Sequence, residues 1–192
     1  RRLDRLISDI SDASRLDAEL ARSDAKPVDL EVLISSLVDI SREIRSGKKA
    51  VKIDCVVEQK PGANHAFIVH GHDLRLGQIV TNLIENARSF VPEETGRILV
   101  KLSRNRSRYL IQVEDNGPGI QAEDIDRIFE RFYTDRPEGE SFGQNSGLGL
   151  SISRQIAEAH GGTLRAENVM DPATGRITGA RFILSLPVAA AA

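Results

Sequence analysis

Apolar positions recur along the chain with two periods, and the change from one to the other predicts an alternation of helices and strands. Residues 1–22 carry apolar side chains at three- and four-residue spacing, which is typical of an amphipathic helix. Residues 23–27 break this spacing and end at Pro27, which disfavours helix at the preceding residue. Helical spacing returns at Val28 and continues to Gly47. The first quarter of the chain is therefore predicted to form a helix, a linker and a second helix.

Alternation and turn residues predict the remaining elements. Strands are expected near residues 51–57, 66–70, 98–102, 109–113, 164–166 and 182–186. Helical spacing predicts a helix over 73–90 with Asp73 as its N-cap, and another over 148–160 that Gly161 ends. Most strands follow one another as hairpins with few crossovers. The sequence therefore predicts an α+β fold, with a mixed, mostly antiparallel sheet and helices on one face.

Composition narrows the function classes without choosing one. The 192 residues carry a formal net charge of −2, so no sequence-wide basic footprint for nucleic acid is expected. No run of 18 apolar residues is present, which excludes a membrane-spanning helix from the sequence. The single Cys55 excludes an intramolecular disulfide framework. Because the chain opens inside an amphipathic pattern, we expect a piece of a longer protein.

The first of four segments with candidate chemistry is NLIENA, residues 82–87. Asn82 and Asn86 lie four residues apart and share one face of the predicted helix. An amide oxygen can bind Mg²⁺ on a triphosphate, since that ion needs few protein ligands. Two solvated or capping amides are the alternative interpretation.

The second segment is DNGPGI, which directly follows an apolar strand. Asp115 ends that strand, and its carboxylate can accept a hydrogen bond from an exocyclic amine. Gly117 and Gly119 let the backbone approach a flat ring without an intervening Cβ. A tight turn is the alternative interpretation.

The third and fourth segments border a Gly-rich stretch, residues 134–147. The third holds Phe129, Phe132 and Tyr133, which either anchor the start of that stretch or form a small satellite core. The fourth is SGLGLS, residues 146–151, at the start of a predicted helix. Free N–H groups and the positive end of the helix dipole favour phosphate there.

In this order and spacing, the four segments resemble the N, G1, F and G2 boxes of sensor histidine kinases, within the GHKL group of ATPases. The resemblance covers residues 28–187, and the stretch 86–91 is similar to kinases of the ChvG, ExoS and BvrS type from alphaproteobacteria. Residues 1–22 resemble the second helix of a dimerisation and phosphoacceptor hairpin. The implied fold is a two-layer α/β sandwich of the GHKL (Bergerat) type over 28–188, preceded by one long helix and followed by a frayed tail, 189–192.

The resemblance also implies a set of ATP-binding residues drawn from all four boxes. These are Asn82, Asn86, Phe90, Asp115, Gly117, Gly119, Ile120, Phe132, Ser146, Gly147, Leu148, Gly149 and Leu150. Asp115 would accept a hydrogen bond from the adenine amino group, and Phe90 would flank the ring. Asn86, with Asn82 second, would hold Mg²⁺. Residues 132–146 would form the ATP lid.

Three places depart from the family's pattern, one of them being Gln144 and Asn145, which replace a more Gly-rich run in the predicted lid. Ser89 stands where many members carry a lysine that contacts the phosphates, and Arg88, Arg131 and Arg136 are the candidates to replace its charge. Ala180 stands where a threonine often supports the adenine through water.

The implied reaction transfers the ATP γ-phosphate to a histidine on the first hairpin helix, and then to a response-regulator aspartate. No His precedes His65, so the acceptor is expected outside this chain. The implied setting is the cytoplasmic part of a bacterial inner-membrane sensor, which is a homodimer through residues 1–22. The alternatives are a GHKL ATPase and a nucleotide-gated interaction module. Such ATPases use a Glu general base where this chain has Asn82, an amide that cannot take a proton.

Histidines elsewhere carry weaker hypotheses. His65, His70 and His72 surround a strand end, where a metal site is a minor alternative. His160 is expected at a helix C-terminus, where the helix dipole would stabilise its charged form.

Overall fold

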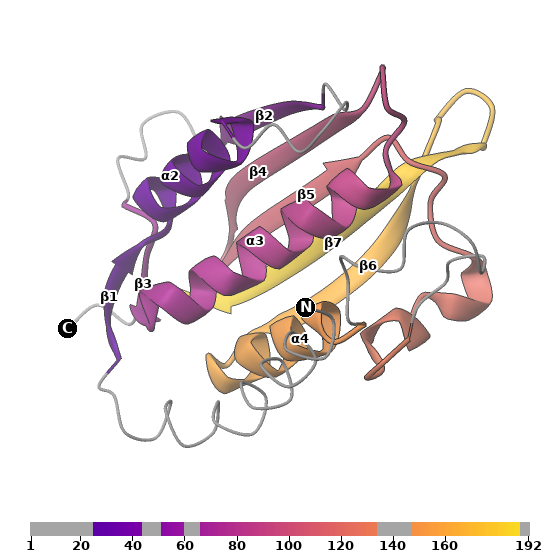
Figure 1. Ribbon diagram of the computed structural model, residues 1–192. Helices are drawn as coiled ribbons and strands as arrows, with labels where there is room; N and C mark the ends of the chain where they lie inside the picture. Colours follow the sequence, from indigo (N-terminus) through magenta and orange to yellow (C-terminus); the bar gives the residue numbers. More distant parts are fainter. Residues whose placement is uncertain (1–24, 44–50, 60–65, 134–146, 189–192) are drawn as a thin grey trace.

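A computed structural model describes residues 25–43, 51–59, 66–133 and 147–188. Its main sheet has five strands in the order β2-β4-β5-β7-β6 (Figure 1). The strands are β2 (Lys52–Val57), β4 (Arg97–Asn105), β5 (Arg108–Asp115), β6 (Thr163–Met170) and β7 (Ile177–Pro187). Only β2 pairs in parallel, with β4, and the other neighbours are antiparallel. The predicted mixed, mostly antiparallel sheet is confirmed.

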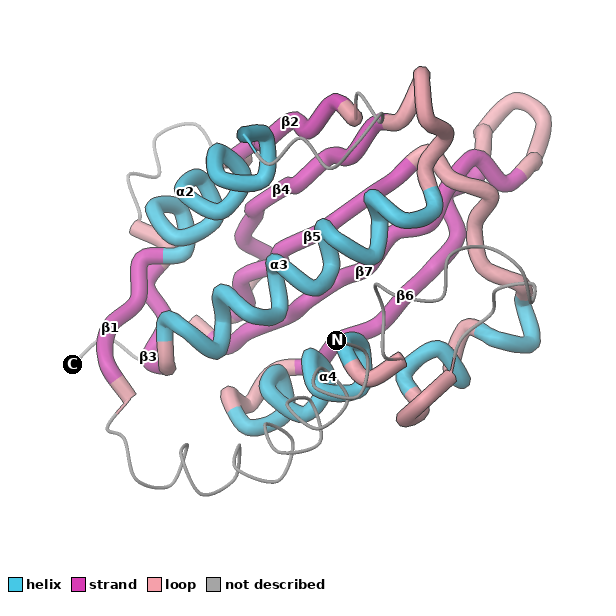
Figure 2. The backbone as a smooth tube through the Cα atoms, viewed as in Figure 1, coloured by secondary structure: helices cyan, strands magenta, loops and turns pink. Residues whose placement is uncertain are grey.

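Three helices cover one face of this sheet, as the tube drawing in Figure 2 shows. They are α2 (Leu30–Glu43), α3 (Asp73–Phe90) and α4 (Gly149–Ala159). The long α3 crosses the middle of the sheet, with α2 on one side and α4 on the other (Figure 1). Two short 3-10 turns, η1 (Ala122–Asp124) and η2 (Arg127–Phe129), follow β5. The fold is the two-layer α/β arrangement that the sequence predicted.

The start of α2 corrects the sequence prediction. Lys26–Asp29 form strand β1, which pairs antiparallel with β3 (Ile68–Gly71) in a second, two-stranded sheet. The predicted linker therefore ends in a strand, and the helix begins at Leu30 instead of Val28. Asp29 explains the boundary, because its Oδ1 accepts hydrogen bonds from the backbone N–H groups of residues 31 and 32 at 3.0 and 3.3 Å.

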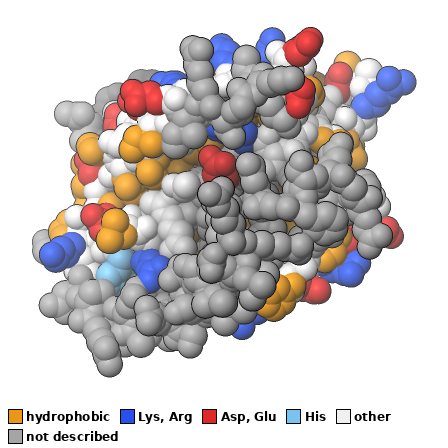
Figure 3. All heavy atoms as spheres, viewed as in Figure 1, with side chains coloured by type: hydrophobic (Ala, Val, Ile, Leu, Met, Phe, Trp, Pro, Cys, Tyr) orange, Lys and Arg blue, Asp and Glu red, His pale blue; other side chains and the backbone are white. Residues whose placement is uncertain are grey.

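The core lies between the helices and the sheet and is almost wholly aliphatic. Helix α3 buries Leu83, Ile84 and Ala87 completely, against the inward-facing side chains of β4, β5 and β7. Figure 3 views the helix-bearing face, where hydrophobic side chains gather over α2. Val32 and Ile40 of α2 are exposed, at 63% and 53%.

On the far face of the sheet, one set of ion pairs ties together the three strands that border the candidate site. Arg181 on β7 bonds Glu114 on β5 at 2.7 Å and Glu167 on β6 at 2.9 Å. The bond to Glu114 raises the pKa of Arg181 above its ordinary value, with Glu167 adding to it. This bridge supports the registers of β5, β6 and β7 where their inner faces carry functional residues.

Helix α3 spans the predicted residues, with one difference at its start. Its N-cap is His72, and Asp73 is its first residue, with Oδ1 accepting from the N–H of Leu74 at 2.8 Å. Across the part of the chain that the structure describes, no helix is long and apolar enough to cross a membrane.

Candidate nucleotide-binding site

Asp115 lies at the end of β5, on the sheet face that the helices cover. The alternation that buries Val113 places Asp115 at the next inward position. Its Oδ1 accepts hydrogen bonds from the N–H of Gly117 at 2.8 Å and of Ala180 at 3.3 Å. Burial raises the pKa of this carboxyl above its ordinary value, although both N–H donors act against that shift. No described residue donates to Oδ2, so this oxygen is left to accept from a ligand.

Two glycines, Gly117 and Gly179, pack against Asp115 so closely that a side chain on either would collide. A Cβ on Gly117 would lie 2.9 Å from Asp115 Oδ1 and 3.0 Å from the Phe90 carbonyl oxygen. Gly119 has a φ of +82°, which favours glycine. A Cβ on Gly179, in β7, would overlap the carbonyl of Asp115. The glycines of DNGPGI thus serve a close backbone approach, and Gly179 is a site residue that the sequence analysis did not assign.

The two asparagines of α3 have different surroundings. Asn82 donates from Nδ2 to the Gly149 carbonyl and to Ser153 Oγ, both at 3.2 Å. Asn86 is half-buried, and no hydrogen bond to its side chain occurs within the described residues. One turn further along α3, the Phe90 carbonyl approaches Gly117, and Phe90 itself is 38% exposed. Helix α3 therefore reaches from the start of α4 to the loop after Asp115, with Asn86 between them.

The start of α4 carries the SGLGLS segment, of which Ser146 lies outside the described residues. Gly147 has a φ of +73°, Leu148 is buried, and Gly149 opens the helix. Leu150 is half-buried against the core. The first backbone N–H groups of a helix have no intrahelical acceptor, so this end suits an anion.

The aromatic segment divides between core and surface. Phe129 is buried, stacks edge-on against Phe182, and lies 4.4 Å below the guanidinium carbon of Arg154. Phe132 is 56% exposed, has a φ of +64°, and donates its N–H to the Gly147 carbonyl at 3.0 Å. The two described ends that flank residues 134–146 therefore lie side by side. Phe129 therefore belongs to the main core instead of a satellite core, and Phe132 lies at the start of the predicted lid.

Of the three arginines considered as replacements for the missing lysine, Arg88 serves the fold. It is buried, and its guanidinium donates to the Ser41 carbonyl of α2 at 2.6 Å. This contact holds α3 on α2 and directs Arg88 toward α2. Arg131 is exposed, and Arg136 lies outside the described residues.

Two further asparagines border the loop after β5. Asn168 of β6 exchanges two hydrogen bonds with the backbone of Ile120, each of 2.7 Å. Asn116 binds the N–H of Arg97 at 2.7 Å and the Thr95 carbonyl at 2.9 Å. Neither role was predicted from the sequence. For Asn168 a signal existed, because a polar residue stands where strand alternation predicts an apolar one.

His160 and His72 meet at the other end of α3 and α4, away from Asp115. His160 Nε2 accepts the backbone N–H of His72 at 3.1 Å, and its Nδ1 lies 2.7 Å from the Ile156 carbonyl. Nδ1 therefore donates, and the ring is neutral. Burial lowers the pKa of His160, to which His72 adds. The expectation of a charged His160 stabilised by the helix dipole is thus corrected, because Nε2 acts as an acceptor.

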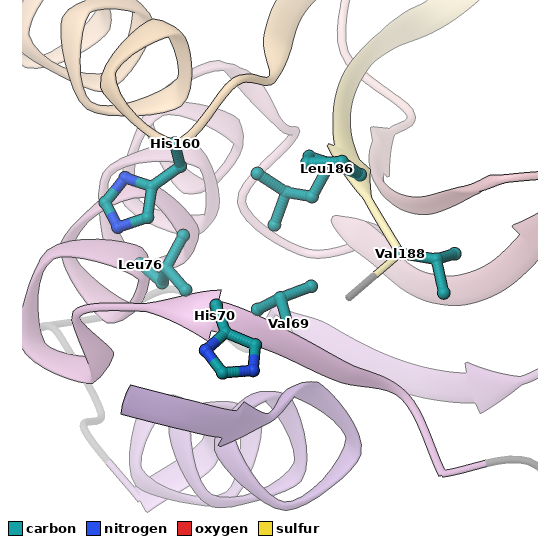
Figure 4. Close-up of a pocket in the computed structure, with 7 residues that line it drawn as sticks. Val69, His70, Leu76, His160, Leu186 and Val188 are labelled. Atoms are coloured by element: carbon teal, nitrogen blue, oxygen red, sulfur yellow. The ribbon is translucent and has the colours of Figure 1, made fainter. Parts of the chain in front are cut away.

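A cavity of about 360 Å³ adjoins His160, and Figure 4 shows the side chains around it. Val69, Leu76 and Leu186 form its apolar walls, and His70 lies at its edge. Because it lies at the far ends of α3 and α4, this cavity is separate from the Asp115 site. His65 lies outside the described residues, and no group of three metal-binding side chains occurs within them.

The family model for histidine kinase-, DNA gyrase B- and HSP90-like ATPases matches residues 71–190. This range contains Asn82, Asn86, Asp115 and the start of α4, the residues that the fold brings to one side of the sheet.

Individual proteins show the same relationship. The sensor protein ChvG of Agrobacterium fabrum is 76% identical over 189 residues, which are 98% of this chain and 32% of ChvG. The mycobacterial sensor histidine kinase MprB superposes with a TM-score of 0.68 at 29% identity, covering 85% of this chain and 97% of the MprB chain. Full-length ShkA in complex with AMPPNP superposes with a TM-score of 0.75 at 27% identity, covering 99% of this chain and 36% of ShkA.

The chain thus spans about a third of the length of the ChvG protein that it matches. The predicted fold and the predicted resemblance are confirmed by these matches. By its matched domain, the chain belongs to the histidine kinase-, DNA gyrase B- and HSP90-like ATPase family, and it is similar to ChvG sensor proteins over nearly its whole length.

Proposed function

We propose that the chain binds ATP–Mg²⁺ between Asp115 and the start of α4, as the catalytic domain of a sensor histidine kinase. The observation that carries the proposal is the Asp115 carboxylate, buried at a strand end with Oδ1 fixed by two N–H donors. A carboxylate fixed in this way leaves Oδ2 to accept the exocyclic amine of adenine without further reorganisation. The AMPPNP complex of ShkA supports a nucleotide in this fold.

The residues present fit a magnesium ion held mainly by phosphate oxygens. Asn86 offers a neutral amide oxygen on α3, between the start of α4 and the loop after Asp115. Mg²⁺ accepts such ligands. Asn82 is the second candidate, through Oδ1, because its Nδ2 is bonded to Gly149 and Ser153. When bound, the ion would neutralise phosphate charge, while the N–H groups at the start of α4 would hold phosphate oxygens.

Binding without hydrolysis is the expected behaviour of this site. Asn82 stands at the position of the general base in the related ATPases, and an amide cannot accept a proton from water. Glu85 is exposed and lies 4.0 Å from the buried Arg88 side chain. The other carboxylate of α3 is Asp73, at the first residue of the helix. The lack of a general base at position 82 favours phosphoryl transfer over steady hydrolysis of ATP.

The whole protein would transfer the γ-phosphate to a histidine on a helix absent from this sequence, and then to an aspartate of a response-regulator receiver domain. Residues 1–22 would pair in a homodimer, and the domain would lie on the cytoplasmic side of an inner-membrane sensor. The similarity to ChvG and other sensor proteins supports these assignments.

Transfer in trans tests this function. The chain is mixed with ATP–Mg²⁺ and a separate hairpin fragment that carries the candidate histidine, and acid-labile phosphate on that fragment is measured. We expect phosphate to appear on the hairpin and to be absent with an Asp115→Ala chain. Steady release of inorganic phosphate that a Glu85→Gln change abolishes would contradict the kinase assignment in favour of an ATPase.

A further inference from the structure

Asn168 holds the loop that follows Asp115 in a closed pair of hydrogen bonds. Its Oδ1 accepts the N–H of Ile120 and its Nδ2 donates to the carbonyl of the same residue, each at 2.7 Å. A side-chain amide can supply a donor and an acceptor side by side, which matches one backbone N–H and C=O. A hydroxyl or a carboxylate in this place would satisfy only part of the pair.

The position of Asn168 on its strand is unusual for a polar side chain. Leu164 and Ala166 precede it at two-residue spacing and face the helices, so Asn168 lies on the same inner face of β6. Gly119, next to Ile120, has a φ of +82°, and a Cβ there would lie 2.8 Å from Asn168 Oδ1. The close approach of the amide to the loop therefore depends on glycine at 119.

The contact closes a ring of bonds around Asp115. Asn168 is the cross-strand partner of Ala180 in the β6–β7 pair. Ala180 donates its N–H to Asp115 Oδ1, and residues 116–120 run from Asp115 back to Asn168. The position of the loop backbone relative to the Asp115 carboxylate is therefore set through the β6–β7 hairpin as well as through its own turn.

We propose that Asn168 is a positioning residue of the nucleotide site, which fixes the backbone of residues 117–120 at the distance from Asp115 that an adenine ring requires. This inference rests on the proposed function, because it assumes that Asp115 binds adenine. Asn168 acts through the loop and contacts no reacting atom. Without its amide, the loop samples other positions, and nucleotide affinity falls with the fraction of molecules in the competent arrangement.

The test compares Asn168→Asp with the natural chain by calorimetric titration of ADP and GDP with Mg²⁺. Asp keeps the shape of the side chain but loses the donor to the Ile120 carbonyl and places a negative charge beside it. We expect ADP to bind about tenfold more weakly or worse, because the part-buried Ile120 carbonyl loses its partner. The ratio of ADP to GDP affinity should fall too, since the loop that shapes the adenine position is displaced.

The matched control is Thr178→Val in the same hairpin. Thr178 is exposed, and its Oγ1 donates to the Val169 carbonyl at 3.3 Å rather than to the loop, so ADP affinity should be unchanged. Unfolding by urea without nucleotide separates positioning from stability, and Asn168→Ser serves as a second variant if Asn168→Asp does not fold.

The outcomes separate the two claims. Natural affinity and natural ADP-to-GDP ratio in a folded Asn168 variant would overturn the positioning role, even if the variant unfolds at lower urea. Absence of ADP binding by the natural chain would instead overturn the proposed function, and the role of Asn168 with it.

Discussion

Asn82 donates from its side-chain amide to the carbonyl oxygen of Gly149 at 3.2 Å, and this bond joins the middle of α3 to the first residue of α4. A second bond from the same nitrogen reaches Ser153 Oγ, which itself donates to the Gly149 carbonyl at 2.8 Å. At the other end of the same pair of helices, His160 accepts the N–H of His72. The two helices that border the candidate site are therefore bonded to each other at both ends of α4.

Replacement of Asn82 by Ala should weaken the fold and the nucleotide site together. The change removes both bonds to α4, so the free energy of unfolding should fall by about 1–2 kcal/mol. The start of α4 loses a fixed partner at its phosphate end, so ADP should also bind more weakly. Urea unfolding and calorimetry measure the two effects.

Thr81→Ala is the matched control for that change. Thr81 is the exposed neighbour of Asn82 on the same helix, and both quantities should stay close to those of the natural chain. If Asn82→Ala behaved like this control, the bond between α3 and α4 would have no measurable role.

Asp115→Asn should separate stability from binding. The amide oxygen still accepts from Gly117 and Ala180, while the cost of a buried charge disappears. The free energy of unfolding without nucleotide should therefore rise at pH 7. Affinity for ADP should fall at least about tenfold, because an amide N–H₂ placed at Oδ2 would oppose the adenine amine.

The sign of the pH dependence follows from the raised pKa of Asp115. The folded carboxyl holds its proton to a higher pH than the unfolded one, so the ionised group lowers the free energy of unfolding near neutral pH. This destabilisation disappears as the pH falls through the folded pKa, so the extra free energy of unfolding of Asp115→Asn over the natural chain should shrink with it. A difference that stays constant on acidification would argue against a carboxylate that burial destabilises.

His160 should make the fold sensitive to acid in the opposite direction. Burial lowers its pKa below the ordinary 6.5, so the neutral ring stabilises the fold fully above that value, and the stabilisation is lost as the pH falls through the folded pKa. Between pH 7.5 and 5, His160→Gln should show a smaller loss in the free energy of unfolding than the natural chain, since the amide does not titrate. Equal losses in both chains would assign the acid sensitivity to other groups.

The sequence predicted the parts of the fold that depend on local patterns. Helix α3 has the predicted bounds because the helical spacing of apolar residues continues over its eighteen residues and breaks after Phe90. Strand β1 was missed, because the apolar Val28 fits the helical period as well as the strand, and pairing with β3 decides between them. The capping role of Asp29 was a local signal that would have placed the helix start correctly.

The candidate site likewise contains residues that local sequence patterns predict and residues that only the strand order brings there. Asp115 and its glycines were predictable, because a carboxylate at the end of an alternating strand must lie at the inner edge of the sheet. Asn168 and Gly179 come from strands β6 and β7, much later along the chain, and their contact with the loop depends on the β5–β7–β6 order. The neutral state of His160 was not predictable either, since it requires the N–H of His72 as a donor from a different helix.

Calorimetric titration of ATP–Mg²⁺ into the natural chain and into Asp115→Ala tests the central claim most directly. We expect saturable binding at one site in the natural chain and no detectable binding in the variant, with the same far-ultraviolet circular dichroism spectrum for both. Unchanged ATP affinity in a folded Asp115→Ala chain would contradict the assignment of this carboxylate, and with it the proposed site.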